Sequence, residues 1–213
     1  MRAIITLFTI TLALVPSFGT VHAQAPDQQR CTLTVDQSPA VRGIRLGMVT
    51  EQVFALFPGS SERPETKNAI ASAGGHPNYG VVGLYFQPFT YPSAAMERFS
   101  GIESISITLF DGRVTDMRVV YAGSSSYPRG PAWSNVDDFI AKLSEAFALP
   151  GAKDWLQLSE STKTLKCNGF DLEASTRGAT GSIALRDNAV AYQDIVRQRA
   201  AADEEKMRRE FKP

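Results

Sequence analysis

Apolar and polar residues alternate on both sides of Asp111-Gly112, near the middle of the chain. The alternating apolar residues are Ile105, Ile107 and Leu109 before this pair and Met117, Val119 and Tyr121 after it. Strict alternation indicates half-buried β-strands, and an Asp-Gly pair between two such runs is typical of a tight turn. The sequence therefore predicts a β-hairpin over residues 102–121.

The length of the hairpin loop decides which residues face each other. A two-residue loop in a regular hairpin would place Asp116 opposite Ile107, which would put a charge on the apolar face. A three-residue loop over 110–112 pairs odd positions with odd positions and keeps the two faces distinct. We therefore expect a type I turn with Gly112 in the left-handed conformation as a G1 bulge.

Two segments have apolar residues at the spacing of a helix. The first covers residues 50–57 and stops at Pro58-Gly59, and the second covers 134–147 and stops at Pro150-Gly151. Ser134-Asn135-Val136-Asp137 has the form of a capping box at the start of the second helix. The remaining expected elements are a connection that can hold a short helix over 60–78, strands at 81–86, 163–167, 170–175 and 181–186, and a polar helix from about Ala189 to Glu210.

The two halves of the chain follow a similar order of elements. Residues 51–59 parallel residues 144–151, and each helix is followed by about three strands, so a duplication and a chance coincidence both stay open. A helix and a small sheet each have one apolar face to bury. We therefore expect an α+β fold of two helix-plus-antiparallel-sheet units in tandem, at 43–122 and 133–187, followed by a polar C-terminal helix at 188–213.

The N-terminus has the layout of a secretory signal peptide. Arg2 precedes an apolar and hydroxyl-bearing run over residues 3–14, and small residues precede cleavage sites after Ala23 and Ala25. A membrane anchor would need about 20 uninterrupted apolar residues, whereas Pro16 and Gly19 interrupt this run. We expect a signal peptide at 1–23, a leader segment at 24–42, a periplasmic or secreted protein, and no stable membrane insertion after cleavage.

Charge and cysteine content narrow the possible partners and the compartment. The 22 basic and 22 acidic side chains balance, which argues against a nucleic-acid-binding surface. The two cysteines, Cys31 and Cys167, lack the spacing of a redox motif. In an oxidising compartment such an even pair usually bonds, so we expect a structural disulfide.

Catalytic signatures are missing from the sequence. The mature chain has one histidine, His76, and no nucleophile, phosphate-binding or metal-binding motif accompanies it. We therefore expect a non-enzymatic protein without catalytic residues, cofactor or metal. Two alternatives remain: a carrier that holds a small apolar ligand between helix and sheet, lined by residues such as Phe54, Ile107 and Val119, and a hydrolase with an unrecognised carboxylate site.

The segment from Gly43 to Val53, Gly-Ile-Arg-Leu-Gly-Met-Val-Thr-Glu-Gln-Val, resembles a known repeat opening. The outer-membrane assembly lipoprotein BamE and the β-lactamase inhibitor protein share this opening, which is roughly Gly-Met-Thr-x-x-Gln-Val before a helix and an antiparallel sheet. The resemblance implies an α+β module that works by protein–protein contact. Val49 stands where the family has a helix-capping Thr, so Thr50 is expected to cap the helix instead.

The expected function is an exported protein-interaction module whose partner is an unknown protein. A sheet with helices on one face leaves its other face free, and Ser104, Ser106 and Thr108 would make that face polar. Aromatic anchors dominate many protein interfaces. The predicted partner-binding residues are Phe89, Tyr91 and Phe110.

Overall fold

The computed structural model describes residues 31–73, 80–123 and 132–210. The predicted signal peptide, the first part of the leader segment, His76 and the last three residues lie outside the described residues. Within the described part of the chain, no helix has both the length and the apolar composition needed to cross a membrane.

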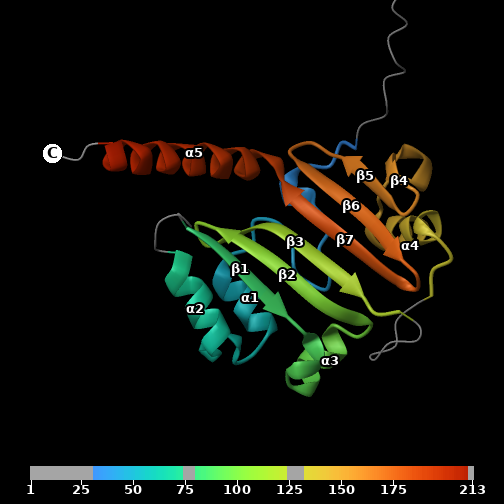
Figure 1. The fold of residues 1–213 in the computed structure, drawn as a ribbon. Helices are drawn as coiled ribbons and strands as arrows, with labels where there is room; N and C mark the ends of the chain where they lie inside the picture. The colour runs from blue at the N-terminus through green and yellow to red at the C-terminus, as the bar shows by residue number, and fades with distance from the viewer. Residues whose placement is uncertain (1–30, 74–79, 124–131, 211–213) are drawn as a thin grey trace, which may run out of the picture.

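The described chain combines helices with antiparallel strands (Figure 1). Its α-helices are α1 (Thr50–Leu56), α2 (Pro64–Ala73), α3 (Ser93–Arg98), α4 (Val136–Phe147) and α5 (Asn188–Glu210). Its strands are β1 (Val81–Phe86), β2 (Ile102–Phe110), β3 (Arg113–Tyr121), β4 (Leu156–Ser159), β5 (Thr162–Lys166), β6 (Phe170–Arg177) and β7 (Thr180–Asp187).

All seven strands form one antiparallel sheet in the order β1-β2-β3-β7-β6-β5-β4. The first half of the chain supplies β1 to β3, the second half supplies β4 to β7, and the two halves meet where β3 pairs with β7. The predicted α+β class is confirmed. The two predicted sheets are parts of one continuous sheet, and a duplication of the halves stays a prediction.

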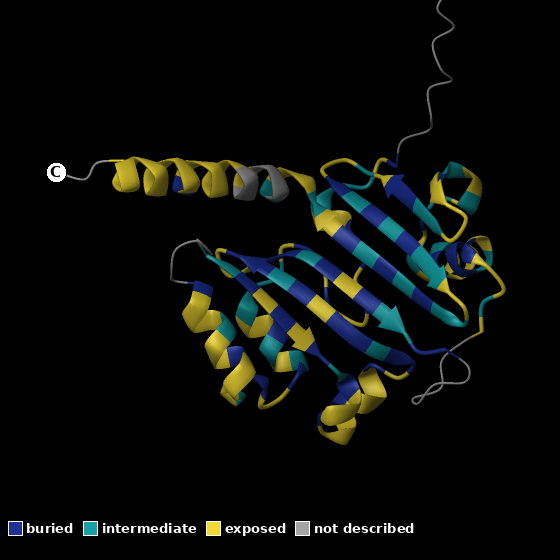
Figure 2. Cartoon of the chain, viewed as in Figure 1, coloured by how far each residue is buried: buried dark blue, intermediate teal, exposed yellow. Residues whose placement is uncertain are grey.

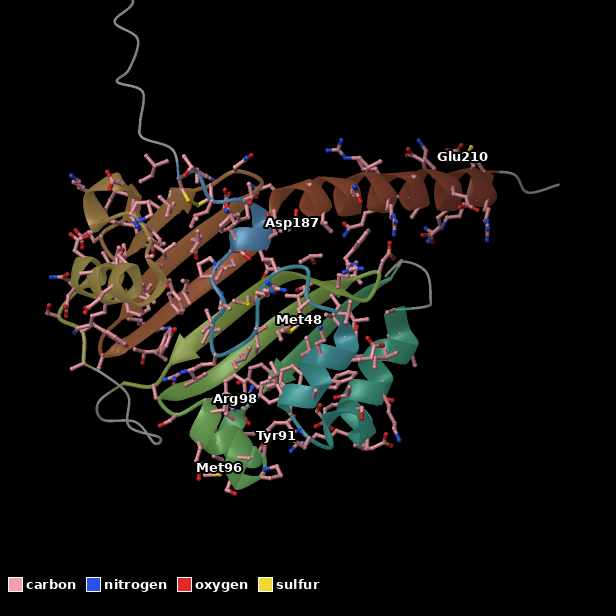
Figure 3. The ribbon with its side chains drawn as sticks, turned by 180° about the vertical axis from the view of Figure 1, so that it is seen from behind. Met48, Tyr91, Met96, Arg98, Asp187 and Glu210 are labelled. Atoms are coloured by element: carbon pink, nitrogen blue, oxygen red, sulfur yellow. A yellow bond between two sulfur atoms is a disulfide. The ribbon has the colours of Figure 1, made fainter. Side chains whose placement is uncertain are left out.

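One face of the sheet is packed against helices. A row of buried residues crosses this face from strand to strand: Leu84, Ile107, Met117, Leu185, Leu172 and Leu165. Figure 3 shows α1 and α4 in front of the strands on this side. Phe139 of α4 lies so close to β7 that a side chain at Gly181 would meet its ring at 2.8 Å. The core therefore lies between the sheet and these helices.

The hairpin between β2 and β3 differs from the predicted one. Phe110 pairs with Arg113, so the loop has two residues, and both Asp111 (φ 48°) and Gly112 (φ 74°) are left-handed. Such a loop is a type I′ turn, and the predicted three-residue G1 loop is wrong. A bulge at Thr115 shifts the register by one residue and pairs Ile107 with Met117. The expected pairing of odd with odd positions is therefore present beyond the bulge.

Two helix starts also differ from expectation. Val49 is the N-cap residue of α1, and its backbone N–H donates to the Gln52 side chain at 3.3 Å. Thr50 does not cap the helix, since its hydroxyl donates to the carbonyl of Gly112 at 3.0 Å and ties α1 to the hairpin turn. The cap of α4 is Asn135, whose side chain accepts from the Asp138 N–H at 2.9 Å.

The predicted disulfide between Cys31 and Cys167 is present. It attaches the N-terminal segment to the connection between β5 and β6, beside a backbone hydrogen bond from Asn168 N–H to the Leu33 carbonyl at 2.9 Å. A disulfide of this kind fits an oxidising compartment.

Candidate functional site

The sheet face opposite α1 and α4 presents polar side chains from neighbouring strands. We call it the open face, and define it by the residues that share its central row: Tyr85, Ser106, Arg118, Ala184 and Glu173. Figure 2 shows exposed and half-buried positions alternating with buried ones along these strands. This alternation is expected where one face of a sheet is solvated and the other is packed.

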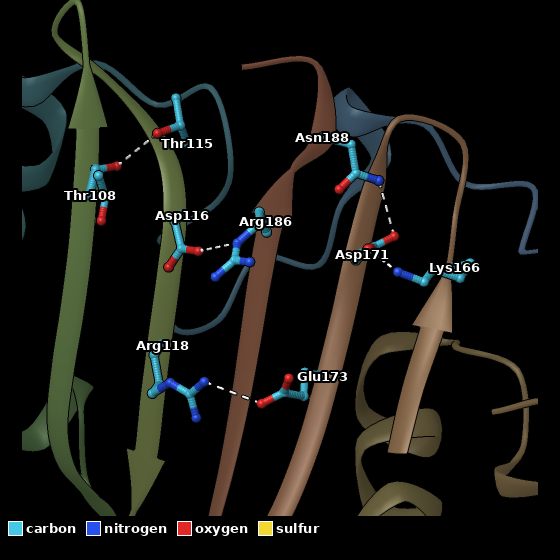
Figure 4. Close-up of polar contacts among 9 residues, drawn as sticks. All are labelled: Thr108, Thr115, Asp116, Arg118, Lys166, Asp171, Glu173, Arg186 and Asn188. Atoms are coloured by element: carbon cyan, nitrogen blue, oxygen red, sulfur yellow. Dashed lines mark hydrogen bonds and ion pairs between the residues drawn. The ribbon is translucent and has the colours of Figure 1, made fainter. Parts of the chain in front are cut away.

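An ion pair joins the two halves of the chain on the open face. Arg118 of β3 reaches over β7 to Glu173 of β6, with Nη2 3.2 Å from Oε1 (Figure 4). Strands two places apart are separated by almost 10 Å. Only long side chains cover that distance, and the residue between them in the row is the small Ala184.

The neighbouring row carries two further ion pairs. Asp116 accepts from Arg186 Nε at 2.9 Å, and this hydrogen bond is the main cause that raises the pKa of Arg186. Asp171 contacts Lys166 and accepts from the Asn188 amide at 3.0 Å. The rows therefore present alternating positive and negative groups, an arrangement suited to complementary charges on a partner.

The polar residues predicted for the free face lie on it. Ser104, Ser106 and Thr108 pair with Val120, Arg118 and Asp116 respectively. Ser106 is exposed, Thr108 is half-buried, and Ser104 is buried. The charged residues of the face escaped the sequence-based prediction, although their alternation with core residues along β3, β6 and β7 could have found them.

A large aromatic side chain stands at one margin of the open face. Tyr85 of the edge strand β1 is 58% exposed and shares the central row with Ser106 and Arg118. At the opposite edge of the sheet, Leu158 of β4 is 59% exposed. Both were absent from the predicted partner-binding residues, although Tyr85 alternates with buried Leu84 and Phe86 in the sequence.

The three predicted partner-binding residues differ in accessibility. Phe89, in the 3₁₀ turn Pro88–Thr90, is 38% exposed. Tyr91 is 6% exposed, and its ring lies 5.3 Å from that of Phe57 with the Arg63 guanidinium stacked 3.9 Å from its centroid. The structure therefore corrects the expectation that Tyr91 is an accessible anchor.

Phe110 is also 6% exposed, so the same correction applies to it. The Arg197 guanidinium of α5 lies 4.4 Å from its ring centroid and donates to Asp111 at 3.0 and 3.3 Å. These contacts hold α5 against the hairpin tip, where Figure 1 shows the helix crossing the end of the strands. Binding of a partner by Phe89, Tyr91 or Phe110 stays a prediction.

A pocket of about 450 Å³ lies on the helix-covered side, between α4 and residues 40–42. The residues predicted to line a cavity, Phe54, Ile107 and Val119, do not line this one. Ile107 and Val119 are buried in the core instead. Among the described residues, no cluster of three or more His, Cys, Asp and Glu side chains could hold a metal ion.

Comparisons of the chain with protein-family models, with curated proteins and with solved structures gave no match.

Proposed function

We propose that this protein is an exported, non-enzymatic binding module that captures a protein partner on its open face. The observation that carries the proposal is the continuous polar face built by strands from both halves of the chain. A stable interface buries about 800 Å² on each partner, and the open face extends across paired strands that lie about 4.8 Å apart.

The chemistry of the open face suits protein recognition. Tyr85 provides an exposed aromatic ring in the same row as the Arg118–Glu173 ion pair, with Ser106 of β2 between Tyr85 and Arg118. Aromatic and arginine side chains are enriched among residues that dominate binding energy. The intramolecular ion pairs hold the charged side chains in place before binding, which lowers the entropy cost of ordering them.

The sequence supports export and a binding role. The signal-peptide pattern at residues 1–23 and the Cys31–Cys167 disulfide both fit an oxidising compartment outside the cytoplasm. The resemblance of residues 43–53 to the repeat opening of BamE and the β-lactamase inhibitor protein also favours a protein-interaction module.

A photo-crosslinking experiment tests this proposal. A photoreactive phenylalanine analogue replaces Tyr85 in one variant and Met96 in a control variant. Met96 is 39% exposed and lies on the outside of α3 (Figure 3). After irradiation in a mixture of the exported proteins of the source cells, we expect the Tyr85 variant to form one discrete adduct with another protein. Excess wild-type protein, which lacks the photoreactive group, should suppress this adduct.

Binding of the captured protein is then measured with Tyr85→Ala and Met96→Ala. Loss of an aromatic anchor costs about 2 kcal/mol, or roughly thirtyfold in affinity, whereas Met96→Ala should leave affinity unchanged. Adducts formed equally from both positions, or unchanged affinity in Tyr85→Ala, would contradict binding through the open face.

A further inference from the structure

The pocket beside α4 has an apolar, aromatic wall. Val41, Leu143 and Phe147 contribute aliphatic and aromatic surface, and Tyr121, Trp133 and Phe139 form a cluster of rings. The centroid of Phe139 lies 4.7 Å from that of Trp133 and 5.7 Å from that of Tyr121, and both contacts are edge-on. The volume of about 450 Å³ is within the range of small-molecule sites.

The charged side chains that line the pocket are Arg42 and Lys142, and no acidic residue is among the described lining residues. Lys142 is already paired with Asp138 at 3.2 Å and donates to the Ala132 carbonyl at 2.8 Å. Arg42 donates to the Ser100 carbonyl at 3.4 Å and forms no ion pair with any residue that the structure describes. Its positive charge is therefore available to an anionic group.

The Tyr121 hydroxyl adds a neutral hydrogen-bond donor. Burial raises the pKa of Tyr121 to about 12, although the charge of Arg42 acts in the opposite direction. The hydroxyl is therefore protonated at neutral pH, and it forms no hydrogen bond with the residues in the described ranges. A ligand oxygen held near Arg42 would therefore meet both the positive charge of the Arg42 guanidinium and the hydrogen-bond donor of the Tyr121 hydroxyl.

We propose that this pocket binds an amphiphilic carboxylate, with the carboxylate at Arg42 and the apolar chain against the aromatic wall. A cation beside an apolar cavity favours a ligand that carries a negative head group and an apolar body, since burying an unpaired charge is costly. The pocket lies on the helix-covered side of the sheet, whereas the proposed protein-binding surface is the open face. The two proposals can therefore fail independently.

Titration calorimetry with decanoate and decanol, both below their aggregation limits, tests the ligand class. We expect the wild-type protein to bind decanoate more tightly than decanol. Arg42→Gln should weaken decanoate binding about fivefold, the value of an ion pair worth about 1 kcal/mol, and leave decanol binding unchanged. Arg45→Gln is the matched control, because Arg45 is an exposed arginine of the same segment that does not line the pocket.

The two tryptophans locate the bound ligand. Trp133 lines the pocket, whereas Trp155 is buried elsewhere and donates to the Pro150 carbonyl at 3.0 Å. In ¹H–¹⁵N spectra, decanoate should shift the Trp133 indole resonance and leave that of Trp155 in place; Trp155→Phe assigns the two. Ala146→Phe, at an exposed lining position, should block binding without lowering the melting temperature.

Three results would overturn the proposal. The first is equal affinity for decanoate and decanol, with no effect of Arg42→Gln. The second is a decanoate titration that shifts only the Trp155 resonance. The third is that a folded wild-type protein binds neither decanoate at millimolar concentration nor decanol up to its solubility limit.

Discussion

Phe89 and Tyr91 stand two residues apart but contribute differently to the molecule. Phe89 keeps 38% of its surface exposed, whereas Tyr91 lies among Phe57, Phe86 and the Arg63 guanidinium. The side chain of Phe57 links this cluster, because its ring stacks on Phe86 at 4.1 Å. A substitution at buried Tyr91 should therefore lower the stability of the fold much more than one at exposed Phe89.

Tyr91→Ala should lower the free energy of unfolding by about 3–5 kcal/mol, because removing a buried aromatic ring leaves a cavity. Phe89→Ala should lower it by less than about 1 kcal/mol, since surface substitutions usually have small effects. Urea unfolding followed by circular dichroism compares the two variants. Equal stabilities would contradict the burial of Tyr91.

Tyr121 predicts a dependence of stability on alkaline pH. Its pKa is about 12 in the folded protein and about 10 in an unfolded chain. The native state therefore holds this proton more tightly, and stability is lost as pH rises above about 10.

Denaturant unfolding of Tyr121→Phe and wild type between pH 9 and 11 measures this effect. The loss for wild type approaches at most about 2–3 kcal/mol once both states are deprotonated. Tyr121→Phe should lose less stability over the same range. A smaller slope remains in the variant, because burial also raises the pKa of Tyr91. Identical slopes in the two proteins would count against the elevated pKa of Tyr121.

At the scale of elements, the close approach of α4 to β7 depends on a glycine. A Cβ atom at Gly181 would lie 2.8 Å from the Phe139 ring, a distance that forces either the helix or the ring to move. A Cβ atom at Gly83 in β1 would have no neighbouring atom within 4 Å. The two strand glycines therefore form a matched pair.

Gly181→Ala should destabilise the protein by about 1–3 kcal/mol through overpacking. Gly83→Ala should be neutral or stabilise by up to about 1 kcal/mol, because alanine restricts the unfolded chain more than glycine does. Thermal unfolding of both variants checks the difference. A Gly181→Ala variant as stable as Gly83→Ala would mean that α4 does not pack on β7 as described.

The strongest periodic patterns predicted their elements well. The helices at α1 and α4 and six of the strands follow from apolar spacing, with boundaries that differ by one or a few residues. The helix α3 and the strand β4 were missed, because with six and four residues they are too short for a repeating apolar pattern to stand out. The predicted hairpin loop was wrong because the bulge at Thr115 has no signature in the alternation, although Ile105 and Ile107 do pair with the odd residues Val119 and Met117.

At the scale of the whole molecule, the disulfide joins residues that are 136 positions apart. On the chain-entropy model, closing a loop of this length stabilises the folded state by about 5 kcal/mol. We expect the double variant Cys31→Ala/Cys167→Ala to lose up to this amount in denaturant unfolding. Addition of a reductant should lower the stability of wild type toward that of the variant and leave the variant unchanged; a reductant-insensitive wild type would exclude the bond.

The open face could be predicted only in part from the sequence. Alternation along β2 correctly placed Ser104, Ser106 and Thr108 on the face away from the core. Nothing in a single sequence specifies that β3 pairs with β7, and this pairing, together with that of β7 with β6, brings Arg118 within reach of Glu173. The site is therefore a product of long-range strand pairing, which local patterns do not encode.

The junction between β3 and β7 also has a consequence for how the chain folds. Met117 pairs with Leu185, whereas β1 to β3 and β4 to β7 are each connected by neighbours in the chain. Contacts between distant residues form slowly, because a long loop must close first. Until β7 pairs with it, β3 is an edge strand of the first three strands and has unpaired backbone groups. Unpaired strand edges readily pair with other chains. An isolated first half of this protein should therefore self-associate. In the full chain, β3 stays open to such pairing until β7 covers its edge.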